Sequence, residues 1–162
     1  MKPRFVKVNA TCLGKEICCG HHLQLFLVTV LAEPVLNSPR LTQISSDMRD
    51  IDAAYDEGNE RAIMARDLYF NRIKKFVGEY AAEMGGVDLV VFTGGVGENS
   101  PELREYVLRN MEFMGIEFDE VRNRGKRGTD YQITTDASKV KAAVICTDEE
   151  LVIAKDTYRL TK

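Results

Sequence analysis

The stretch that decides the fold runs from Val87 to Ser100 and reads VDLVVFTGGVGENS. Its first half, Val87–Thr93, is the largely apolar run typical of a buried strand. Glycines follow directly, and Ser100-Pro101 then predicts a helix with a Ser N-cap and a Pro at its first position. A strand that passes through glycines into a helix predicts an α/β unit whose corner lets a ligand approach the backbone closely.

Two helices are predicted before this strand. A short helix is expected over Asp47–Asp56, and Glu57-Gly58-Asn59 separates it from a long helix that runs from Glu60 to Gly85-Gly86. Apolar residues three, four or seven positions apart give the long helix one core-facing stripe, formed by Ala62, Tyr69, Ile73, Phe76, Tyr80 and Met84. The opposite face is expected to meet water through Arg66, Lys74, Lys75 and Glu79.

The second half of the chain continues to alternate helices with strands, which predicts the α/β fold class with mainly parallel pairing. The last helix has a well-marked start, because Thr147 and Glu150 have the spacing of a capping box. The core face of the helix after Ser100 is expected to consist of Leu103, Val107, Met111 and Met114. The predicted elements are a helix over Ser100–Gly115, a short strand over Ile116–Phe118, a basic loop over Arg122–Gly128, a strand over Ala142–Cys146 and a helix over Thr147–Tyr158.

Residues 1–43 have a different character. Their apolar residues keep neither a helical nor a strand period, which predicts an irregular leader in front of a domain over residues 44–162. The most apolar run, Leu23–Ala32, is shorter than the roughly 20 residues that cross a bilayer, so no membrane segment is predicted. A zinc site is an alternative interpretation, although adjacent Cys-Cys and His-His pairs fit the usual ligand spacing poorly. Its candidate ligands are Cys12, Cys18, Cys19, His21 and His22.

Composition limits the classes of function. The 162 residues carry 22 basic and 25 acidic side chains, a net charge of -3, which gives no electrostatic reason to expect nucleic acid as a partner. The four cysteines, with Cys146 alone in an apolar run, form no disulfide framework, and a cytoplasmic location is therefore expected. The sequence leaves open whether the chain is a monomer or a homodimer.

Three short runs combine turn residues with groups that can bind a nucleotide or a metal ion: Ser45–Asp50, Val91–Ser100 and Cys146–Leu151. In the glycine-rich run, the helix N-terminus that follows can face phosphate, although a plain glycine-rich turn is the alternative. In the first run, two carboxylates bracket Arg49, which by itself indicates a capped helix start with a local ion pair. In the last run, three acids suit the helix dipole and can equally hold Mg²⁺.

A dinucleotide-binding fingerprint is a weaker interpretation of the glycine-rich run. Gly95 and Gly97 follow a strand, and Asp119 lies about where an acidic residue would meet a ribose. However, Ser100 stands where the fingerprint requires a third glycine or alanine. The run also lies past the middle of the chain, which leaves little room for a complete doubly wound sheet.

In order and spacing, the three runs resemble the C-terminal lobe of acetate kinases, and the long helix resembles theirs over Arg72–Tyr80. The resemblance covers about residues 44–162, and propionate kinases share it, so it does not fix the acyl chain. It implies a lobe of the actin/Hsp70/sugar-kinase (ribonuclease H-like) fold, in which ATP lies between two lobes and its phosphate passes to a short carboxylate such as acetate. The matching motifs are Ser46-Asp47-Met48-Arg49, Phe92-Thr93-Gly94-Gly95-Val96-Gly97-Glu98-Asn99-Ser100 and Thr147-Asp148-Glu149-Glu150-Leu151.

The resemblance also implies roles for individual residues. Glu149 would help to hold the Mg²⁺ that accompanies ATP or ADP. Two positions depart from the family's pattern, because Cys146 stands where Pro is usual and Asp148 where Asn is usual. The residues expected to contact the nucleotide are Asp47, Met48 and Arg49 at its adenosine end, together with Gly95, Val96, Gly97, Glu98 and Asn99.

The family's other lobe carries the substrate-binding and catalytic residues, and residues 1–43 show no match to it. The chain is therefore expected to be inactive alone, and to act on a short-chain carboxylate only when the missing lobe is supplied. Two other interpretations stay open. One is a nucleotide-binding module or one half of a split kinase, and the other is a Cys/His metal-binding protein that reuses the lobe as a scaffold. A frameshifted or truncated gene is one hypothesis for the junction near residue 44.

Overall fold

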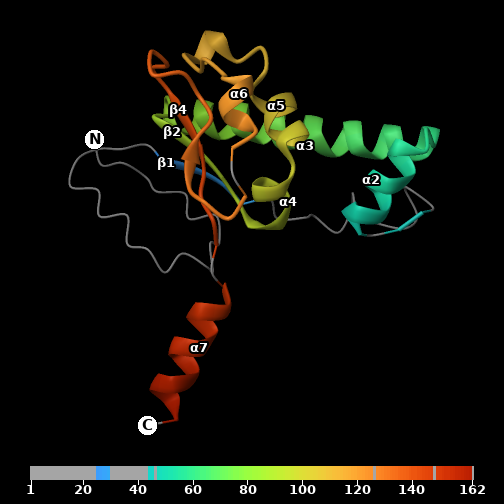
Figure 1. Cartoon of the computed structure of the whole chain (residues 1–162). Helices are drawn as coiled ribbons and strands as arrows, with labels where there is room; N and C mark the ends of the chain where they lie inside the picture. The colour runs from blue at the N-terminus through green and yellow to red at the C-terminus, as the bar shows by residue number, and fades with distance from the viewer. Residues whose placement is uncertain (1–24, 30–43, 46, 126, 148, 162) are drawn as a thin grey trace.

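The prediction of an α/β fold with mainly parallel pairing is confirmed (Figure 1). The computed structural model describes residues 25–29, 44–45, 47–125, 127–147 and 149–161. Its sheet has four strands in the order β1-β2-β4-β3. The strands β1 (Leu25–Thr29), β2 (Leu89–Thr93) and β4 (Lys141–Val144) are parallel, and the short edge strand β3 (Tyr131–Gln132) is antiparallel to β4.

Strand β1 lies in the segment that was expected to be irregular. Leu25 pairs with Leu89 and Thr29 with Thr93, so these five residues continue the sheet beyond β2. The expectation is wrong for them, because a strand needs a partner for its backbone hydrogen bonds, and this partner lies more than 60 residues further along the chain. The cysteines and histidines proposed as zinc ligands lie outside the described residues.

The core lies where α3 and α5 meet the face of the sheet that carries Val90 and Phe92. The last helix, α7, projects away from the rest (Figure 1). The helical elements are α2 (Met48–Asp56), α3 (Glu60–Met84), α4 (Gly94–Asn99), α5 (Pro101–Leu108), a 3-10 turn (Glu112–Met114), α6 (Glu120–Asn123) and α7 (Glu149–Leu160).

The predicted helix boundaries hold where a local capping signal set them. Asp47 caps α2 by accepting the N–H of Arg49, and Ser100 caps α5 by accepting the N–H of Leu103. Gly85 ends α3 in the left-handed conformation, with φ of 73°. Each of these capping residues acts within three residues of the helix end, so the sequence alone is sufficient to predict these helix boundaries.

The buried face of α3 is wider than predicted. Ala62, Tyr69 and Ile73 are buried as expected, whereas Phe76, Tyr80 and Met84 are half-buried and Ala65, Phe70, Val77 and Ala81 join the core. The expectation that Arg66 faces water is wrong, because only 12% of its side chain is exposed. Helix α2 folds back against α3, and the Arg66 guanidinium lies 4.0 Å from the ring centre of Tyr55 and 5.0 Å from that of Phe70.

Helix α5 ends at Leu108, earlier than the predicted Gly115. Asn110 has a φ of 64°, a left-handed conformation that no helix continues through. Met111 is nevertheless buried, and Met114 packs partly against the core from the 3-10 turn that follows. The predicted stripe is therefore divided between α5, which carries Leu103 and Val107, and the segment of the 3-10 turn, which carries the two methionines.

Four further predictions of local structure need correction. The glycine-rich run forms the short helix α4 instead of an open turn, and Ile116 and Phe118 form isolated bridges, to Val140 and Thr134, instead of a strand. The predicted loop at Arg122–Gly128 begins inside α6. Helix α7 begins at Glu149, so Thr147 is not its N-cap. The Thr147 hydroxyl donates to Glu98 instead of taking part in the predicted capping box with Glu150. The side chain of Glu150 lies outside the described residues.

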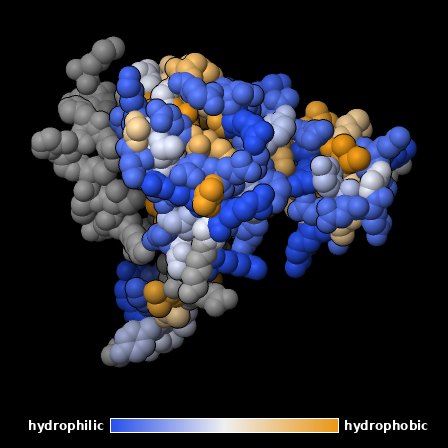
Figure 2. Space-filling model, turned by 45° about the horizontal axis from the view of Figure 1, so that its top comes forward, coloured by the Kyte–Doolittle hydropathy of each residue, from blue (hydrophilic) through white to orange (hydrophobic). Residues whose placement is uncertain are grey.

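The surface of the described chain is largely hydrophilic on the face shown in Figure 2, with separate apolar patches on the body and on α7 below it. The largest exposed fractions among apolar side chains are those of Val121, Phe113, Leu160, Ile153 and Tyr158. Among the described residues, no helix combines the length and the apolarity that crossing a membrane requires.

Candidate functional site

Two of the three predicted runs meet at one edge of the sheet. Strands β2 and β4 are parallel neighbours, with Phe92 opposite Val144, so their carboxyl ends lie side by side. Helix α4 starts directly after β2, and the chain that leaves β4 passes through Thr147 to α7. Ligands of open α/β sheets bind outside the carboxyl ends of the strands, which makes this edge the candidate site.

The start of α4 is not capped by the residue before it. Thr93 makes no side-chain capping bond, and its buried hydroxyl has no hydrogen-bond partner in the described structure. The N–H of Gly94 is instead accepted by Glu98 Oε1 at 3.0 Å. Amides in the first turn of a helix have no partner within the helix, so those of Gly95 and Val96 are the backbone groups placed for an anion.

The three glycines of this corner have different physical reasons to be glycine. Gly94 has a φ of 73°, in the left-handed region that favours glycine. A Cβ on Gly97 would lie 3.2 Å from the backbone carbon of Phe92, so glycine lets α4 approach β2 closely. A Cβ on Gly95 would meet nothing within 4 Å. Gly95 is therefore the glycine whose surroundings are open to a ligand.

The other predicted residues of this run are used within the fold. Val96 packs partly against the core. The side-chain amide of Asn99 donates to the carbonyl of Gly95 at 2.7 Å, across the length of α4. Glu98 accepts from Thr147 as well as from Gly94, with its Oε1 at 2.8 Å from both the N–H and the hydroxyl of Thr147. The run thus forms a tightly bonded corner whose exposed groups are mainly backbone.

A buried arginine that the sequence prediction missed supports α4 from behind. Arg104, on α5, is 2% exposed, and burial lowers the pKa of its guanidinium. It donates to the carbonyls of Gly97 at 2.7 Å and Glu98 at 2.9 Å. It also donates to both the side chain and the carbonyl of Asn123 and to the hydroxyl of Tyr131. A cation near the last carbonyls of α4 suits the negative end of the helix dipole.

A signal for Arg104 was present in the sequence. Leu103, Val107 and Leu108 are buried at helical spacing, and Arg104 occupies a position within the same stripe. A charged residue inside an apolar stripe is almost never buried without partners, so it predicts a network of hydrogen bonds. Its partners were not predictable, because Asn123 and Tyr131 lie 19 and 27 residues away.

The Asp47–Arg49 run is partly exposed, and its hydrogen bonds are local along the chain. Arg49 donates from Nε and Nη2 to both carboxylate oxygens of Asp47, and its side chain is 89% exposed. This bonding lowers the pKa of Asp47 to about 2 and raises the pKa of Arg49. Met48 packs partly against the core. Within the part of the chain that the structure describes, no hydrogen bond or ion pair joins this run to α4.

The acidic run predicted to bind Mg²⁺ is placed by its backbone alone. Glu149 is the first residue of α7, two residues after Thr147, and its side chain lies outside the described part. Among the described residues, no cluster of three or more His, Cys, Asp or Glu side chains is arranged to hold a metal ion. Mg²⁺ does not need such a cage, because one or two carboxylates usually hold it together with substrate phosphates and water. The chemistry of the run therefore fits Mg²⁺ that arrives with a nucleotide.

The structure argues against the dinucleotide-binding alternative. Asp119, the residue that would meet the ribose, caps α6 by accepting the N–H groups of Val121 and Arg122. The same carboxylate forms an ion pair with Arg122 at 3.2 Å. Its carboxylate is thus already used as the cap of α6.

A cleft of about 680 Å³ lies between α2, α3 and α5, and none of the predicted site residues line it. Its carboxylates outnumber its arginines, so its electrostatic potential disfavours a nucleotide's phosphates. We therefore place the candidate site at the α4 corner. The lining residues of the cleft are Asp52, Tyr55, Asp56, Arg66, Asp67, Phe70, Glu102, Glu105, Tyr106 and Arg109.

The chain is similar to known acetate kinases over about three quarters of its length. The acetate kinase of Bacteroides thetaiotaomicron is 55% identical over 122 residues, which are 75% of this chain and 31% of that protein. The crystal structure of Porphyromonas gingivalis acetate kinase matches with a TM-score of 0.67 and 52% identity, over 76% of this chain and 31% of that one. For Entamoeba histolytica acetate kinase the TM-score is 0.65 and the identity 33%, over 75% and 32% of the two chains.

The chain therefore spans slightly less than a third of the length of these relatives. Its described α/β unit is part of a lobe of the actin/Hsp70/sugar-kinase fold, as the resemblance of its motifs predicted. The model of the acetokinase family matches residues 38–155. On this evidence, the chain belongs to the acetokinase family.

Proposed function

We propose that residues 44–162 form the nucleotide-binding lobe of an acetate-kinase-type phosphotransferase, whose complete form converts ATP and acetate into ADP and acetyl phosphate. Family membership supports this proposal. The structural observation that carries it is the junction of two corners: Glu98, in the glycine-rich run, accepts hydrogen bonds from Thr147, two residues before Glu149. This junction supports a site in which the backbone of the glycine-rich run faces the phosphates and Glu149 meets the metal ion.

Each predicted site residue has a role in this proposal. Asp47, Met48 and Arg49 contact the adenosine end of ATP or ADP, and the Arg49 side chain is 89% exposed. The run from Gly95 to Asn99 contacts the nucleotide through its backbone. Glu149 holds Mg²⁺ together with the phosphates and water.

We further propose that the 162-residue chain does not turn over acetate and ATP by itself. Phosphoryl transfer depends on the positioning of substrates and on charge placed around the transferring group. A single arginine in such a position contributes roughly 10³–10⁵ in rate. The matched segment is slightly less than a third of the relatives' length. A short-chain carboxylate is therefore a substrate only when the remaining lobe is present.

One structural feature favours the alternative that the chain is one half of a split kinase. Helix α7 projects from the body and exposes large apolar side chains, with Ile153 66% and Leu160 80% exposed (Figure 1). Leu151 and Tyr158 on the same helix are also exposed. Grouped apolar side chains on a surface indicate a binding partner. In this version of the proposal, that partner is the lobe that completes the kinase.

Titration with ADP tests the proposed nucleotide site. We expect an affinity of millimolar order, roughly 4 kcal/mol, because one side of the cleft supplies the contacts. Followed by NMR, the amides of Gly95 and Arg49 should shift together. An Arg49→Ala variant should weaken binding, and an Arg109→Ala variant of the exposed surface should not. Shifts absent at millimolar ADP, or confined to residues 1–43, would count against the proposal.

An activity assay distinguishes an inactive nucleotide-binding fragment from one half of a split kinase. Acyl phosphate is trapped with hydroxylamine, first with the chain alone and then after addition of the remaining segment of Porphyromonas gingivalis acetate kinase. Activity that appears only in the mixture, and is lost in Glu149→Ala, supports the split kinase. No activity in either case supports an inactive nucleotide-binding fragment. Family-like turnover by the chain alone would refute the proposed dependence on a second lobe.

A further inference from the structure

We infer that Glu98 is a positioning residue that ties the glycine-rich corner to the segment carrying Glu149, and that its carboxylate does not bind the nucleotide. Three protein donors converge on Glu98 Oε1: the N–H of Gly94 at 3.0 Å, and the N–H and the hydroxyl of Thr147, both at 2.8 Å. We call this set of bonds the Glu98 clamp. Its consequence for the nucleotide rests on the proposed function, whereas the clamp itself is a property of the protein.

The chemistry of the clamp requires a carboxylate. Hydrogen bonds that a charged oxygen accepts are about twice as strong as those between neutral groups. Each carboxylate oxygen offers about two lone-pair directions, so an oxygen with three donors is already fully used. An oxygen in this state is a poor ligand for a metal ion and repels a phosphate. Oε1 of Glu98 is thus used to hold the corner together and is not available to the nucleotide.

The first half of the clamp replaces a missing helix cap. Helix α4 has only six residues, and Thr93 before it makes no side-chain capping bond. Glu98 reaches back four residues to the N–H of Gly94, the first residue of α4. A carboxylate at a helix start also suits the positive end of the dipole. The Glu98 side chain therefore fixes the first turn of α4, where the amides of Gly95 and Val96 lie.

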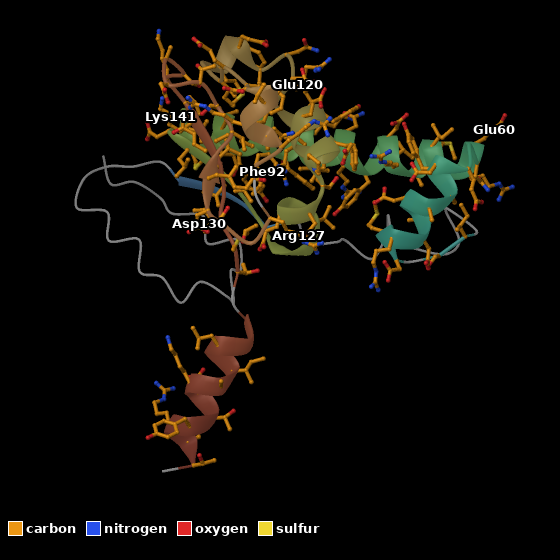
Figure 3. All side chains as sticks on the ribbon, viewed as in Figure 1. Glu60, Phe92, Glu120, Arg127, Asp130 and Lys141 are labelled. Carbon is orange, nitrogen blue, oxygen red and sulfur yellow. The ribbon has the colours of Figure 1, made fainter. Side chains whose placement is uncertain are left out.

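The second half of the clamp fixes the chain that leaves β4. Thr147 lies 49 residues from Glu98 in sequence, so its two hydrogen bonds are long-range contacts. The preceding N–H, of Cys146, is accepted by Asp130 at 2.9 Å, and Figure 3 shows Asp130 at the end of the body from which the chain leaves toward α7. With these two residues held, a single residue, Asp148, separates Glu149 from the clamp, and this short link limits the backbone position of Glu149.

The clamp is itself held from behind. Arg104 donates to the carbonyls of Gly97 and Glu98, so both the backbone and the side chain of Glu98 are bonded to the protein. A displacement of α4 would therefore move the start of the acidic run with it. The predicted effect of losing Glu98 is a loss of alignment between the amides that face the phosphates and the carboxylate that meets Mg²⁺.

Hydrogen exchange in the whole chain tests the clamp without a nucleotide. Glu98→Ala should speed exchange of the Gly94 and Thr147 amides by about tenfold or more, while Val90 and Ile133 in the core stay protected. Glu98→Gln keeps an oxygen acceptor without the charge and should give an intermediate effect at the same two amides. Glu79→Ala, on the exposed side of α3, is the matched control and should change neither. Unchanged exchange at Gly94 or Thr147 in both Glu98 variants would overturn the clamp.

The same variants test the consequence for the nucleotide. ADP affinity is measured with Mg²⁺ and with a chelator. If Glu98 only positions the site, Glu98→Gln should reduce the gain in affinity from Mg²⁺ several-fold and leave Mg²⁺-free binding within about twofold. Equal weakening under both conditions would show that Glu98 does not act by aligning the α4 amides with the Mg²⁺ ligand, which overturns the inference. If the unaltered chain binds no ADP, the proposed function fails, while the exchange result still decides whether the clamp exists.

Substitutions of Thr147 test the Glu98 clamp from its other side. Thr147→Val removes the hydroxyl donor and keeps the N–H, whereas Thr147→Ser keeps both. The valine variant should reproduce part of the exchange effect at Gly94, 53 residues away in sequence, and the serine variant should not. Equal effects of valine and serine would show that the hydroxyl of Thr147 does not take part.

Discussion

The glycine-rich corner and the Asp47–Arg49 corner are both proposed to bind the nucleotide, but they are held in place differently. Helix α4 is held by Arg104 and Thr147, which lie on other elements, and Gly97 is buried against β2. Asp47 and Arg49 bond to each other across two residues, and the Arg49 side chain is 89% exposed. The first corner is formed by the tertiary structure before a ligand arrives, whereas the second has only local bonds to fix it.

This difference has a consequence for binding. A preorganised group loses little conformational entropy when a ligand binds, but an exposed side chain must be immobilised, at about 0.5–1.5 kcal/mol. The α4 corner is therefore expected to provide most of the residual affinity of this chain. Arg49 is expected to contribute its full share of the nucleotide affinity only when a second protein surface limits the movement of its side chain. Substitutions in the two corners should accordingly differ in kind, since those near α4 change stability and those near Arg49 change local electrostatics.

The largest expected effect is that of Arg104→Met. Methionine keeps the apolar part of the side chain but leaves the carbonyls of Gly97, Glu98 and Asn123 without their donor. Breaking a buried charged network costs about 3–5 kcal/mol of unfolding free energy. Urea denaturation of the two proteins measures the difference.

The control for this substitution is Arg109→Met. Arg109 forms an exposed pair with Glu105 on the same helix, and its loss should cost less than about 0.5 kcal/mol. Similar losses in the two variants would show that Arg104 is not the buried support that distinguishes the α4 corner.

A smaller effect is expected from replacing the glycines of α4. In Gly97→Ala, the added Cβ meets the backbone of Phe92 at 3.2 Å, so α4 must move away from β2. Overpacking of this kind costs about 1–3 kcal/mol. In Gly95→Ala, the Cβ meets nothing within 4 Å, and the loss of freedom in the unfolded chain should stabilise by about 0.4–1 kcal/mol. Thermal unfolding measures the stability of the two variants. A larger loss of stability in Gly95→Ala than in Gly97→Ala would contradict the close packing of α4 on β2.

The smallest effect is expected in the second corner, and it is a change in titration. The side chain of Arg49 is the main cause that holds the pKa of Asp47 at about 2, below the ordinary 3.8, so Arg49→Ala should raise this pKa toward 3.8. Because the pKa is lowered in the folded state, the stabilisation from the pair is present above about pH 3.8 and is lost as the pH falls through about 2. NMR titration of the Asp47 carboxyl carbon measures the shift. Arg109→Ala should leave the curve unchanged, and an unchanged curve in Arg49→Ala would disprove the local ion pair.

The sequence by itself determined the features that depend on neighbours close along the chain. The capped starts at Asp47 and Ser100, the stop at Gly85 and the α/β alternation were predicted because each signal and its partner lie within a few residues. The family was evident for a related reason, since three short runs carry its motifs in the same order and spacing.

Only the tertiary structure decided which of these features meet. The pairing of β1 with β2 and the burial of Arg104 depend on partners that lie far away in sequence. The role of Glu98 is the clearest case, because an exposed-looking acid in a nucleotide motif becomes an internal acceptor once Thr147 is brought to it. The physical reason is that a hydrogen bond depends on distances of about 3 Å in space. Sequence patterns report such distances only within one helix or strand, and the packing of the sheet sets all the others.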